Sequence, residues 1–341
     1  ENKLKVFGPK KLAAQLESSK DFAKSFMDRH KIPTAKYKTF TKIKDAHRYI
    51  NEEGAPIVIK ADGLAAGKGV VVAMTVQEAL VAVDSMLEDN LFGDAGARVV
   101  IEEFLTGEEV SFIVICDGNS ILPLASSQDH KRLLDLDLGP NTGGMGAYSP
   151  APIVTPELHR KIMSEVIEPT TEGMKKDGIE FSGFLYAGLM IDKDNNIKTL
   201  EFNCRMGDPE TQPILFRLKS DLFEILLAAA NKDIKNYEAK WEVGSAITVV
   251  IAADNYPNQP KINDEILNYN NNNKDAYIFH AGTILKNKRI YTAGGRVLGV
   301  TAKGDSLKNA QEMAYALVKK IEFNGMQYRA DIGNKALMKD L

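Results

Sequence analysis

Apolar and polar residues recur along the chain with two different periods, which predict helices and strands in alternation. Apolar spacings of three and four, as at Ala79, Leu80, Val83 and Leu87, are typical of helices that cover a core. They predict helices near residues 10–30, 42–53, 75–89, 155–177, 209–230 and 305–321. Short apolar runs predict strands at 35–40, 56–60, 69–74, 97–103, 109–116, 120–126, 183–192, 197–203, 245–253, 277–285 and 295–302. The pattern therefore predicts a fold of mixed class, α/β or α+β.

The same pattern predicts three parts. After about residue 230 the elements become short, and NYNNNNK (268–274) reads as a solvated loop of low complexity. We expect a central domain at 16–230 and a small α+β domain at 231–341. Residues 1–15 look like the remnant of an N-terminal domain, because KLKVFGP reads as a strand without a preceding partner. We therefore expect a preceding domain to be absent from this chain.

Composition narrows the class of protein. The 341 residues are 26% charged and 44% hydrophobic, as in ordinary globular proteins. A net charge of -3 gives no general attraction for nucleic acid or for an anionic membrane. Cys116 and Cys204 stand in apolar strand patterns, and two cysteines suit a reducing compartment. No apolar run reaches the length of a membrane span, so we expect a cytoplasmic protein without nucleic-acid or membrane partners.

The stretch KADGLAAGKGV (60–70) suggests bound phosphate but fits neither the P-loop nor the dinucleotide-binding template. Those loops lead from a strand into a helix, whereas this one joins the strands APIVIK and VVVAM. We interpret it as a hairpin tip that closes over phosphate, held by Lys68 and by backbone N–H groups beside Gly63, Gly67 and Gly69. A plain glycine turn is the alternative. Lys60, at the end of an apolar strand, favours the anion site.

A second candidate site lies in TLEFNCRMGDPETQP (199–213). Strand alternation places Glu201 and Asn203 on one face, and two such oxygen ligands suit Mg²⁺. A half-exposed strand with polar residues outward is the alternative. Arg205, Asp208 and Glu210 follow at once and gather charge at a strand end, where ligands bind in many α/β proteins.

Two further segments carry candidate substrate contacts. Residues 126–152 read as a long loop rich in Gly and Pro, and such loops are usually functional. We favour Asp129 and Lys131 as substrate contacts there, and interpret His130 as a surface or hydrogen-bonding residue. Arg296 follows two glycines in TAGGRVLGVTA, which suits a terminal phosphate. The alternative is that Arg296 pairs with a carboxylate of the small domain.

The remaining chemistry is that of phosphoryl transfer. The sequence suggests no Ser-His-Asp or Cys-His arrangement and holds no CxxC or HExxH motif. Lysines, glycines, a carboxylate and an asparagine act in phosphoryl transfer by positioning and by neutralising charge.

Eight stretches together resemble one family. They are IKADGLAAGKGVVVA, EEFLTGEEVSF, DHKR, GPNTGGMGAYSPAP, EFNCRMGDPETQ, FHAGT, GGRVLGVTA and YRADIG. In this order, from about residue 6 to 333, they are similar to the glycinamide ribonucleotide synthetases of the ATP-grasp superfamily. The resemblance implies an ATP-grasp fold, with ATP between two antiparallel sheets, a lid subdomain at about 40–105 and a small C-terminal α+β domain.

The resemblance also implies roles for individual residues. Lys60 and Lys20 would neutralise phosphates, the backbone of Glu102 and Leu105 would read adenine, and Glu109 would lie near the ribose. The full set implied for ATP is Lys20, Lys60, Gly63, Gly67, Lys68, Gly69, Glu102, Glu103, Leu105 and Glu109. Glu201 and Asn203 would hold Mg²⁺ or Mn²⁺.

The implied reaction joins glycine to 5-phosphoribosylamine through a glycyl phosphate, giving glycinamide ribonucleotide, ADP and phosphate. The residues implied for catalysis are Lys60, Arg205, Asp129 and Lys131. Those implied for substrate are Asp129, Lys131, Gly144, Arg205, Asp208 and Arg296. No protein nucleophile is needed. Association or fusion with other purine-pathway enzymes accords with this function.

Two departures and three alternatives accompany the resemblance. LYAGLMI lacks the further metal carboxylate that many ATP-grasp enzymes carry on the neighbouring strand, and the family's N-terminal domain with its GGREHA stretch is missing here. The alternatives are another ATP-grasp carboxylate–amine ligase, a purine-pathway carboxylase, and a non-catalytic nucleotide-binding module. GPNTGGMGAYSPAP together with GGRVLGVTA favours the glycine ligase.

Overall fold

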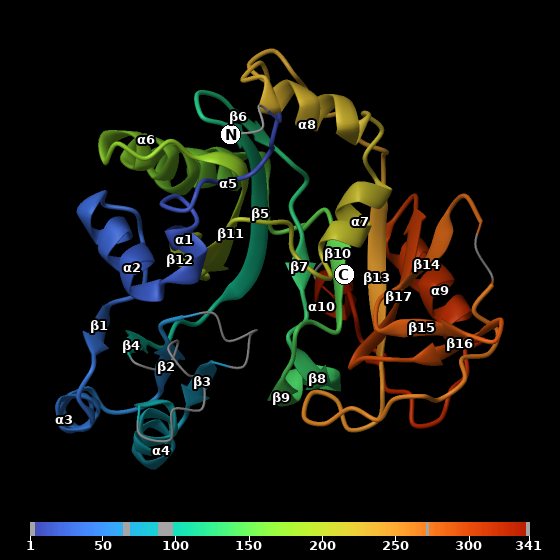
Figure 1. Cartoon of the computed structure of the whole chain (residues 1–341), viewed down its shortest axis with the longest axis horizontal. Helices are drawn as coiled ribbons and strands as arrows, with labels where there is room; N and C mark the ends of the chain where they lie inside the picture. The colour runs from blue at the N-terminus through green and yellow to red at the C-terminus, as the bar shows by residue number, and fades with distance from the viewer. Residues whose placement is uncertain (1–3, 64–68, 88–97, 271–272, 339–341) are drawn as a thin grey trace.

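The computed structural model describes residues 4–63, 69–87, 98–270 and 273–338 (Figure 1). Within these ranges, three antiparallel sheets and two short hairpins are surrounded by helices. None of the helices in the described part of the chain is long and apolar enough to cross a membrane.

The first sheet and its two helices form the lower left lobe of Figure 1. Its elements are β1 (Tyr37–Phe40), α3 (Ile43–Glu53), β2 (Ile57–Ala61), β3 (Val70–Ala73), α4 (Val76–Leu87) and β4 (Val99–Glu103). The strand order is β1-β4-β2-β3, and Lys60 lies opposite Val70, so the predicted hairpin is confirmed. Ile59 and Ile101 pack on the helix side. Because strand side chains alternate, Lys60 and Glu102 point to the other face.

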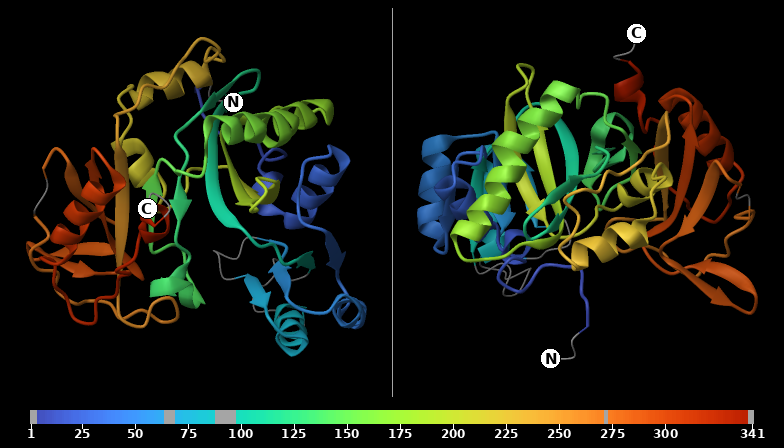
Figure 2. Two further views of the ribbon diagram at one scale, coloured as in Figure 1. Left: turned by 180° about the vertical axis from the view of Figure 1, so that it is seen from behind. Right: turned by 90° about the horizontal axis from the view of Figure 1, so that it is seen from above.

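The second sheet lies between the first sheet and the C-terminal part of the chain (Figure 2). Its strands are β5 (Glu108–Asp117), β6 (Ile121–Pro123), β11 (Ser182–Ile191) and β12 (Ile197–Asn203), in the order β12-β11-β5-β6. The helices that bury its two faces are α1 (Gln15–Ser18), α2 (Lys20–Arg29), α5 (Pro156–Ile162), the π-helical turn η3 (Met163–Ile167), α6 (Glu168–Lys176), α7 (Thr211–Phe216) and α8 (Leu222–Ala230).

The third sheet combines strands from distant parts of the sequence. Its strands are β7 (Gln128–Asp129), β10 (Gly146–Ser149), β13 (Ser245–Ala252), β14 (Ala276–His280) and β17 (Arg296–Gly304), in the order β14-β17-β13-β10-β7. Helix α9 (Leu307–Val318) packs against it, and α10 (Asn334–Leu337) follows. The two hairpins are β8 (Arg132–Leu134) with β9 (Leu138–Asn141), joined by the 3-10 turn η2 (Asp135–Asp137), and β15 (Thr283–Lys286) with β16 (Arg289–Thr292).

The interpretation of residues 126–152 as a long loop was therefore wrong, because the segment holds four short strands. Gly146 of β10 pairs with Val249 of β13, about a hundred residues later. These strands have only two to four residues, and β10 pairs with a strand distant in sequence, so local alternation carries little signal for them. The limits of the three expected parts stay a prediction.

Two predicted helices are divided by capping residues. Ser19 ends the first segment and caps α2 by accepting a hydrogen bond from the Phe22 N–H. Asp221 likewise caps α8 and separates it from α7. The predicted strand 277–285 divides into β14 and β15, and β16 was not predicted.

Candidate functional site

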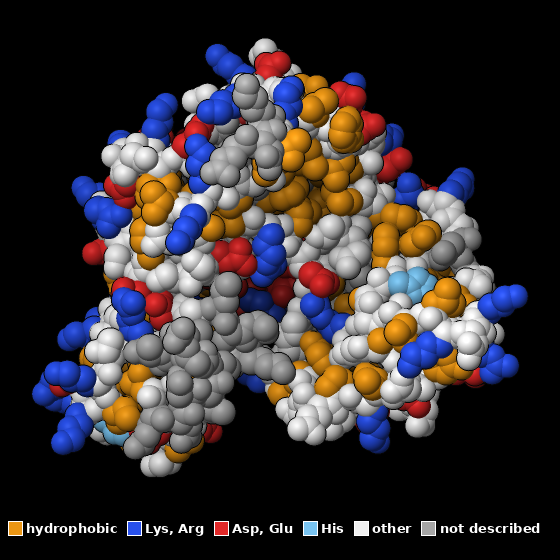
Figure 3. All heavy atoms as spheres, in the orientation of Figure 1, with side chains coloured by type: hydrophobic (Ala, Val, Ile, Leu, Met, Phe, Trp, Pro, Cys, Tyr) orange, Lys and Arg blue, Asp and Glu red, His pale blue; other side chains and the backbone are white. Residues whose placement is uncertain are grey.

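Lys60 and Lys20 meet at the base of the β2–β3 hairpin. The Lys60 ammonium lies 2.9 Å from Oε1 of Glu102 and 3.3 Å from the Leu200 carbonyl oxygen. Lys20 Nζ, at the start of α2, donates to the Gly63 carbonyl at 3.0 Å. Burial lowers the pKa of Lys20 and Lys60 lowers it further, although Glu201 acts in the opposite direction. Both predicted phosphate ligands thus share one cleft, and the centre of Figure 3 shows acidic and basic side chains around a hollow.

Lys24 joins this group, and the sequence reading missed it. Its ammonium lies 2.8 Å from Oε2 of Glu102 and donates to Oγ1 of Thr34 at 2.8 Å. Burial, assisted by Lys60, lowers the pKa of Lys24 to about 8 despite the attraction of Glu102. A signal was available, because Lys24 stands among Ala23, Phe26 and Met27 on the apolar face of α2.

Glu201 and Asn203 project from the same face of β12, as alternation predicted. Burial raises the pKa of Glu201, but Lys131, Lys60 and Lys20 outweigh burial and hold it below its usual value. A register shift opposite Gly188 leaves Leu200 without a partner on β11, next to Glu201. Glu201 is therefore an ionised carboxylate surrounded by three lysines.

Asn203 is held by a chain of contacts that begins in α1. Its Oδ1 accepts a hydrogen bond from Arg205 at 3.1 Å, and Arg205 Nε donates to Glu17 at 3.1 Å. The other oxygen of Glu17 accepts from the Cys204 backbone N–H at 2.8 Å. Glu17, which the sequence did not single out, thus fixes the end of β12.

The donor set fits a hard divalent cation. Glu201 and Asn203 offer two oxygen ligands, and Mg²⁺ completes such shells with phosphate and water. In the described ranges, no group of three or more His, Cys, Asp or Glu side chains is placed to hold a metal ion.

Asp129, at the end of β7, and Lys131 form a second group of charged residues. Lys131 forms an ion pair with Glu109, and its side chain is 40% exposed. Desolvation lowers the pKa of Lys131, but Glu109, Asp129 and Glu201 outweigh it and raise the pKa. Desolvation raises the pKa of Asp129 to about 7, with Glu210 and Glu109 adding to it and Lys131 opposing it.

Glu210 and His130 lie next to this group of charged residues. Glu210 is buried and accepts hydrogen bonds from Ser111 at 3.0 Å and from the Tyr186 hydroxyl at 2.9 Å. His130 is buried, so the surface alternative for it was wrong. Its Nε2 accepts from the Gly333 N–H at 3.4 Å, and the hydrogen-bonding interpretation is confirmed.

Arg296, Asp208 and Gly144 come together at the third sheet. The Arg296 guanidinium donates to both Asp208 carboxylate oxygens at 3.2 and 3.0 Å and to the Gly143 carbonyl at 2.9 Å. The carboxylate partner of Arg296 therefore comes from the turn after β12, not from the small domain as the alternative had it. Gly144 has φ +116°, and a Cβ there would lie 2.4 Å from Cδ of Pro209.

The remaining predicted ATP residues lie at the hairpin and at the link to the second sheet. Gly67 and Lys68 lie outside the described residues. The Gly69 carbonyl accepts from the Ala61 N–H at 2.8 Å. Leu105 is half-buried between β4 and β5. Glu103 accepts from the Lys36 N–H at 2.9 Å and forms an ion pair with Lys198.

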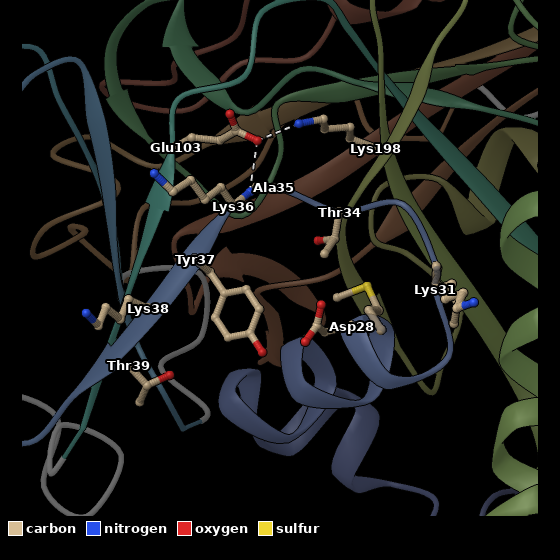
Figure 4. Close-up of a pocket in the computed structure, with 12 residues that line it drawn as sticks. Asp28, Lys31, Thr34, Ala35, Lys36, Tyr37, Lys38, Thr39, Glu103 and Lys198 are labelled. Atoms are coloured by element: carbon tan, nitrogen blue, oxygen red, sulfur yellow. Dashed lines mark hydrogen bonds and ion pairs between the residues drawn. The ribbon is translucent and has the colours of Figure 1, made fainter. Parts of the chain in front are cut away.

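A cavity of about 730 Å³ lies beside this link, between α2 and β1 (Figure 4). Its wall includes Thr34, Tyr37, Glu103 and Lys198. Among the predicted ATP residues that the structure describes, only Glu103 lines it. The cavity is therefore separate from the cleft that holds Lys60 and Glu201.

Comparison with known proteins gives consistent matches. The ATP-grasp (A) domain of phosphoribosylglycinamide synthetase matches residues 18–211, and the C domain of that enzyme matches residues 246–335. A phosphoribosylamine–glycine ligase of Ralstonia nicotianae is 61% identical over 334 residues, covering 98% of this chain and 79% of the relative. One from Neisseria meningitidis is 58% identical over 335 residues, again covering 98% and 79%. The crystal structure of a phosphoribosylamine–glycine ligase from Thermotoga maritima aligns with a TM-score of 0.87 at 36% identity, covering 96% of this chain and 81% of that one.

Proposed function

The chain belongs to the phosphoribosylamine–glycine ligase family of ATP-grasp enzymes, and from this premise we propose which residues carry the reaction. The activity is the ATP-dependent formation of a C–N bond in purine biosynthesis, with glycine and 5-phosphoribosylamine as the substrates that the family name implies. The sequence-based preference for this family over another carboxylate–amine ligase, a carboxylase or a silent module is confirmed.

Lys60 and Lys20 neutralise the ATP phosphates at the base of the hairpin, beside Gly63 and Gly69. The observation that carries this proposal is the placement of Lys20 and Lys60 next to the hairpin loop: Lys20 Nζ lies 3.0 Å from the Gly63 carbonyl oxygen, and the Lys60 ammonium lies 2.9 Å from Glu102. Lysine side chains placed beside a glycine-rich hairpin loop suit a ligand of high negative charge, such as a triphosphate. Adenine then lies at the link from Glu102 to Leu105, with Glu109 at the ribose.

Glu201 and Asn203 are the ligands for Mg²⁺, or for Mn²⁺ in its place. The ion supplies positive charge to the phosphate oxygens when it is bound. Glu201 is held ionised for this role by the three lysines, and Asn203 is oriented by Arg205.

The reaction needs no protein nucleophile. The glycine carboxylate attacks the γ-phosphorus, ADP leaves, and a glycyl phosphate forms. The amine of 5-phosphoribosylamine then attacks the carbonyl carbon, phosphate leaves, and the amine loses a proton. Lys131 and Arg205 balance the charge of the acyl phosphate, and Asp129 accepts the proton. A pKa of about 7 suits Asp129 to this task.

Arg296 is the contact for the ribose phosphate, supported by its place beside Gly143 and Asp208. Asp208 and Gly144 shape the turn that receives this end of the substrate. The Arg296 side chain is 23% exposed, and a phosphate would share its guanidinium with Asp208 or displace that carboxylate.

The test of the metal site separates turnover from binding. We expect Glu201→Gln and Asn203→Ala to lower kcat by about a hundredfold or more, because ligand loss removes charge needed as the γ-phosphate transfers. The affinity for ATP should change by less than about tenfold. ADP release is measured with glycine and with 5-phosphoribosylamine omitted in turn. Asp194→Asn, in the exposed turn before β12, serves as the control. Near-normal turnover of both site variants would remove Glu201 and Asn203 from the metal site.

A further inference from the structure

Three charged side chains meet in the interior next to the phosphate site. Lys24 comes from α2, Glu102 from β4 and Lys60 from β2, and their side chains are 2%, 2% and 8% exposed. Each carboxylate oxygen of Glu102 has its own ammonium, with Lys24 at 2.8 Å from Oε2 and Lys60 at 2.9 Å from Oε1. One buried negative charge therefore lies between two positive ones.

The position of Lys24 is fixed from both sides. Thr34 Oγ1 accepts from the Lys24 ammonium at 2.8 Å and donates to the Thr199 carbonyl at 2.7 Å. Thr199 immediately precedes Leu200, whose carbonyl accepts from Lys60. Lys24 and Lys60 are thus anchored to neighbouring backbone positions of β12. Thr34 also forms part of the cavity wall in Figure 4.

The charges of Lys24, Glu102 and Lys60 sum to +1, so the loss of any one of them changes the net charge that a ligand meets. Within the trio, one ammonium is offset by Glu102, and one positive charge is left over to face Glu201 and a ligand. Without Lys24, Glu102 and Lys60 would neutralise each other as a simple buried pair. In a cleft of low dielectric, a change of one unit charge beside a phosphate strongly alters its binding.

We propose that Lys24 is a positioning residue for ATP: by occupying Oε2 of Glu102, it leaves the charge of Lys60 free to bind the phosphates. The inference rests on the proposed function only in assigning Lys60 to those phosphates. Lys24 itself lies behind Glu102 and need not touch the ligand. Burial lowers the pKa of Lys24 to about 8, so the ammonium is retained at neutral pH.

The experiment compares Lys24→Met, Glu102→Gln and the double variant carrying both. ATP affinity is measured with Mg²⁺ by titration calorimetry on the full chain, and folding by melting temperature. We expect Lys24→Met to weaken ATP binding about ten- to a hundredfold, as for a lost charged contact. In the double variant both the carboxylate and its partner are neutral, so Lys60 keeps its charge and the affinity should return to within about threefold of the wild type. Glu102→Gln alone should bind ATP at least as tightly as the wild type.

If Lys24 had a purely structural role, the ATP affinities of these variants would follow a different order. If Lys24 only filled space, the double variant would bind ATP as weakly as Lys24→Met or more weakly, and that result would overturn the proposal. Weak binding by Glu102→Gln would overturn it as well. If Lys24→Met does not fold, the double variant and Glu102→Gln still decide, because neither leaves a buried unpaired carboxylate.

Two further variants complete the test. Lys36→Met removes the lysine just before β1, whose side chain pairs with Glu53, and it should leave ATP affinity unchanged. Lys60→Met distinguishes the proposed role of Lys60 from that of Lys24. If Lys60→Met does not weaken ATP binding, the assignment of Lys60 fails. If Lys60→Met weakens binding but Lys24→Met does not, only the role of Lys24 fails.

Discussion

His130 shows how one residue can be essential to packing while standing inside a catalytic motif. It is 5% exposed, lies between Asp129 and Lys131, and its imidazole packs 5.9 Å from the Tyr148 ring. Its backbone N–H donates to the Gly146 carbonyl at 2.9 Å. Burial, assisted by Arg329, lowers the pKa of His130 to about 4. The residue is therefore neutral in the folded protein throughout the physiological range.

This shift predicts a pH-dependent stability. Because the folded pKa lies below that of the unfolded chain, the unfolded state binds the proton more readily between about pH 6.5 and 4. Stability from neutral His130 is thus complete above pH 6.5 and is lost as the pH falls, by up to roughly 3 kcal/mol at pH 4. His130→Gln, whose amide oxygen can accept the Gly333 N–H, should flatten this part of the curve in denaturant titrations. His280→Gln, at an exposed site, should not. Equal acid sensitivity of wild type and His130→Gln would contradict the prediction.

At the scale of single residues, the sequence predicted candidate binding residues but not the residues that they contact. Lys60 and Glu201 were recognisable because charged residues within strand patterns need a reason to be there. The contact of Lys24 with Glu102 joins residues 78 positions apart, and that of Arg296 with Asp208 spans 88. Such pairings are set by tertiary structure, so a single sequence holds no trace of them.

At the scale of secondary-structure elements, the turn after β12 depends on Gly144, which is distant from it in sequence. Gly144 lies where a side chain would meet the ring of Pro209, and Pro209 follows Asp208, the partner of Arg296. Glu210, next in line, carries the hydrogen bonds of Ser111 and Tyr186. A displacement of Pro209 would therefore disturb both of its neighbours: Asp208 with its contact to Arg296, and Glu210 with its hydrogen bonds from Ser111 and Tyr186.

Gly144→Ala should accordingly affect substrate more than ATP. A positive φ is unfavourable for alanine and the Pro209 ring cannot bend away, so we expect a loss of about 1–3 kcal/mol in stability. The KM for 5-phosphoribosylamine should rise while ATP affinity is kept, as measured by steady-state kinetics and calorimetry. Gly178→Ala is the matched control, because Gly178 has φ +76° with nothing within 4 Å of a Cβ. Identical behaviour of the two variants would show that contact with Pro209 is unimportant.

Elements with an apolar pattern of their own could be predicted from the sequence, whereas strands that form only by pairing with a distant strand could not. The β2–β3 hairpin follows from two apolar runs around a glycine tip, and the pairing of the two strands was confirmed. Strands β7 and β10 have only two and four residues; β10 pairs with β13, and β7 pairs with β10. Their absence from the sequence prediction reflects a partner that local patterning cannot supply.

In the whole molecule, the third sheet joins what the sequence suggested as separate parts. Tyr148 of β10 is buried in the same core as Ile247, Val249 and Val300. Arg329, with a fully buried side chain, pairs with Asp137 at 2.8 Å and with Asp331 at 2.7 Å. It thereby ties the β8–β9 hairpin to the C-terminal segment. The segment from Asp129 to Gly144 is thus held partly by residues beyond 230.

This arrangement predicts that a chain ending at residue 230 does not fold as an independent domain. Without β13, strand β10 would have an unpaired edge, and Tyr148 and its apolar neighbours would be exposed to water. We expect residues 1–230 alone to aggregate or to lose near-UV circular dichroism and cooperative unfolding. Co-expression with residues 231–341 should restore a soluble complex that binds ATP, because the missing strand is then supplied from a second chain. Size-exclusion chromatography and thermal melts distinguish these states. A monomeric 1–230 chain with a cooperative melt and undiminished ATP affinity would mean that β7 and β10 need no partner from the C-terminal part.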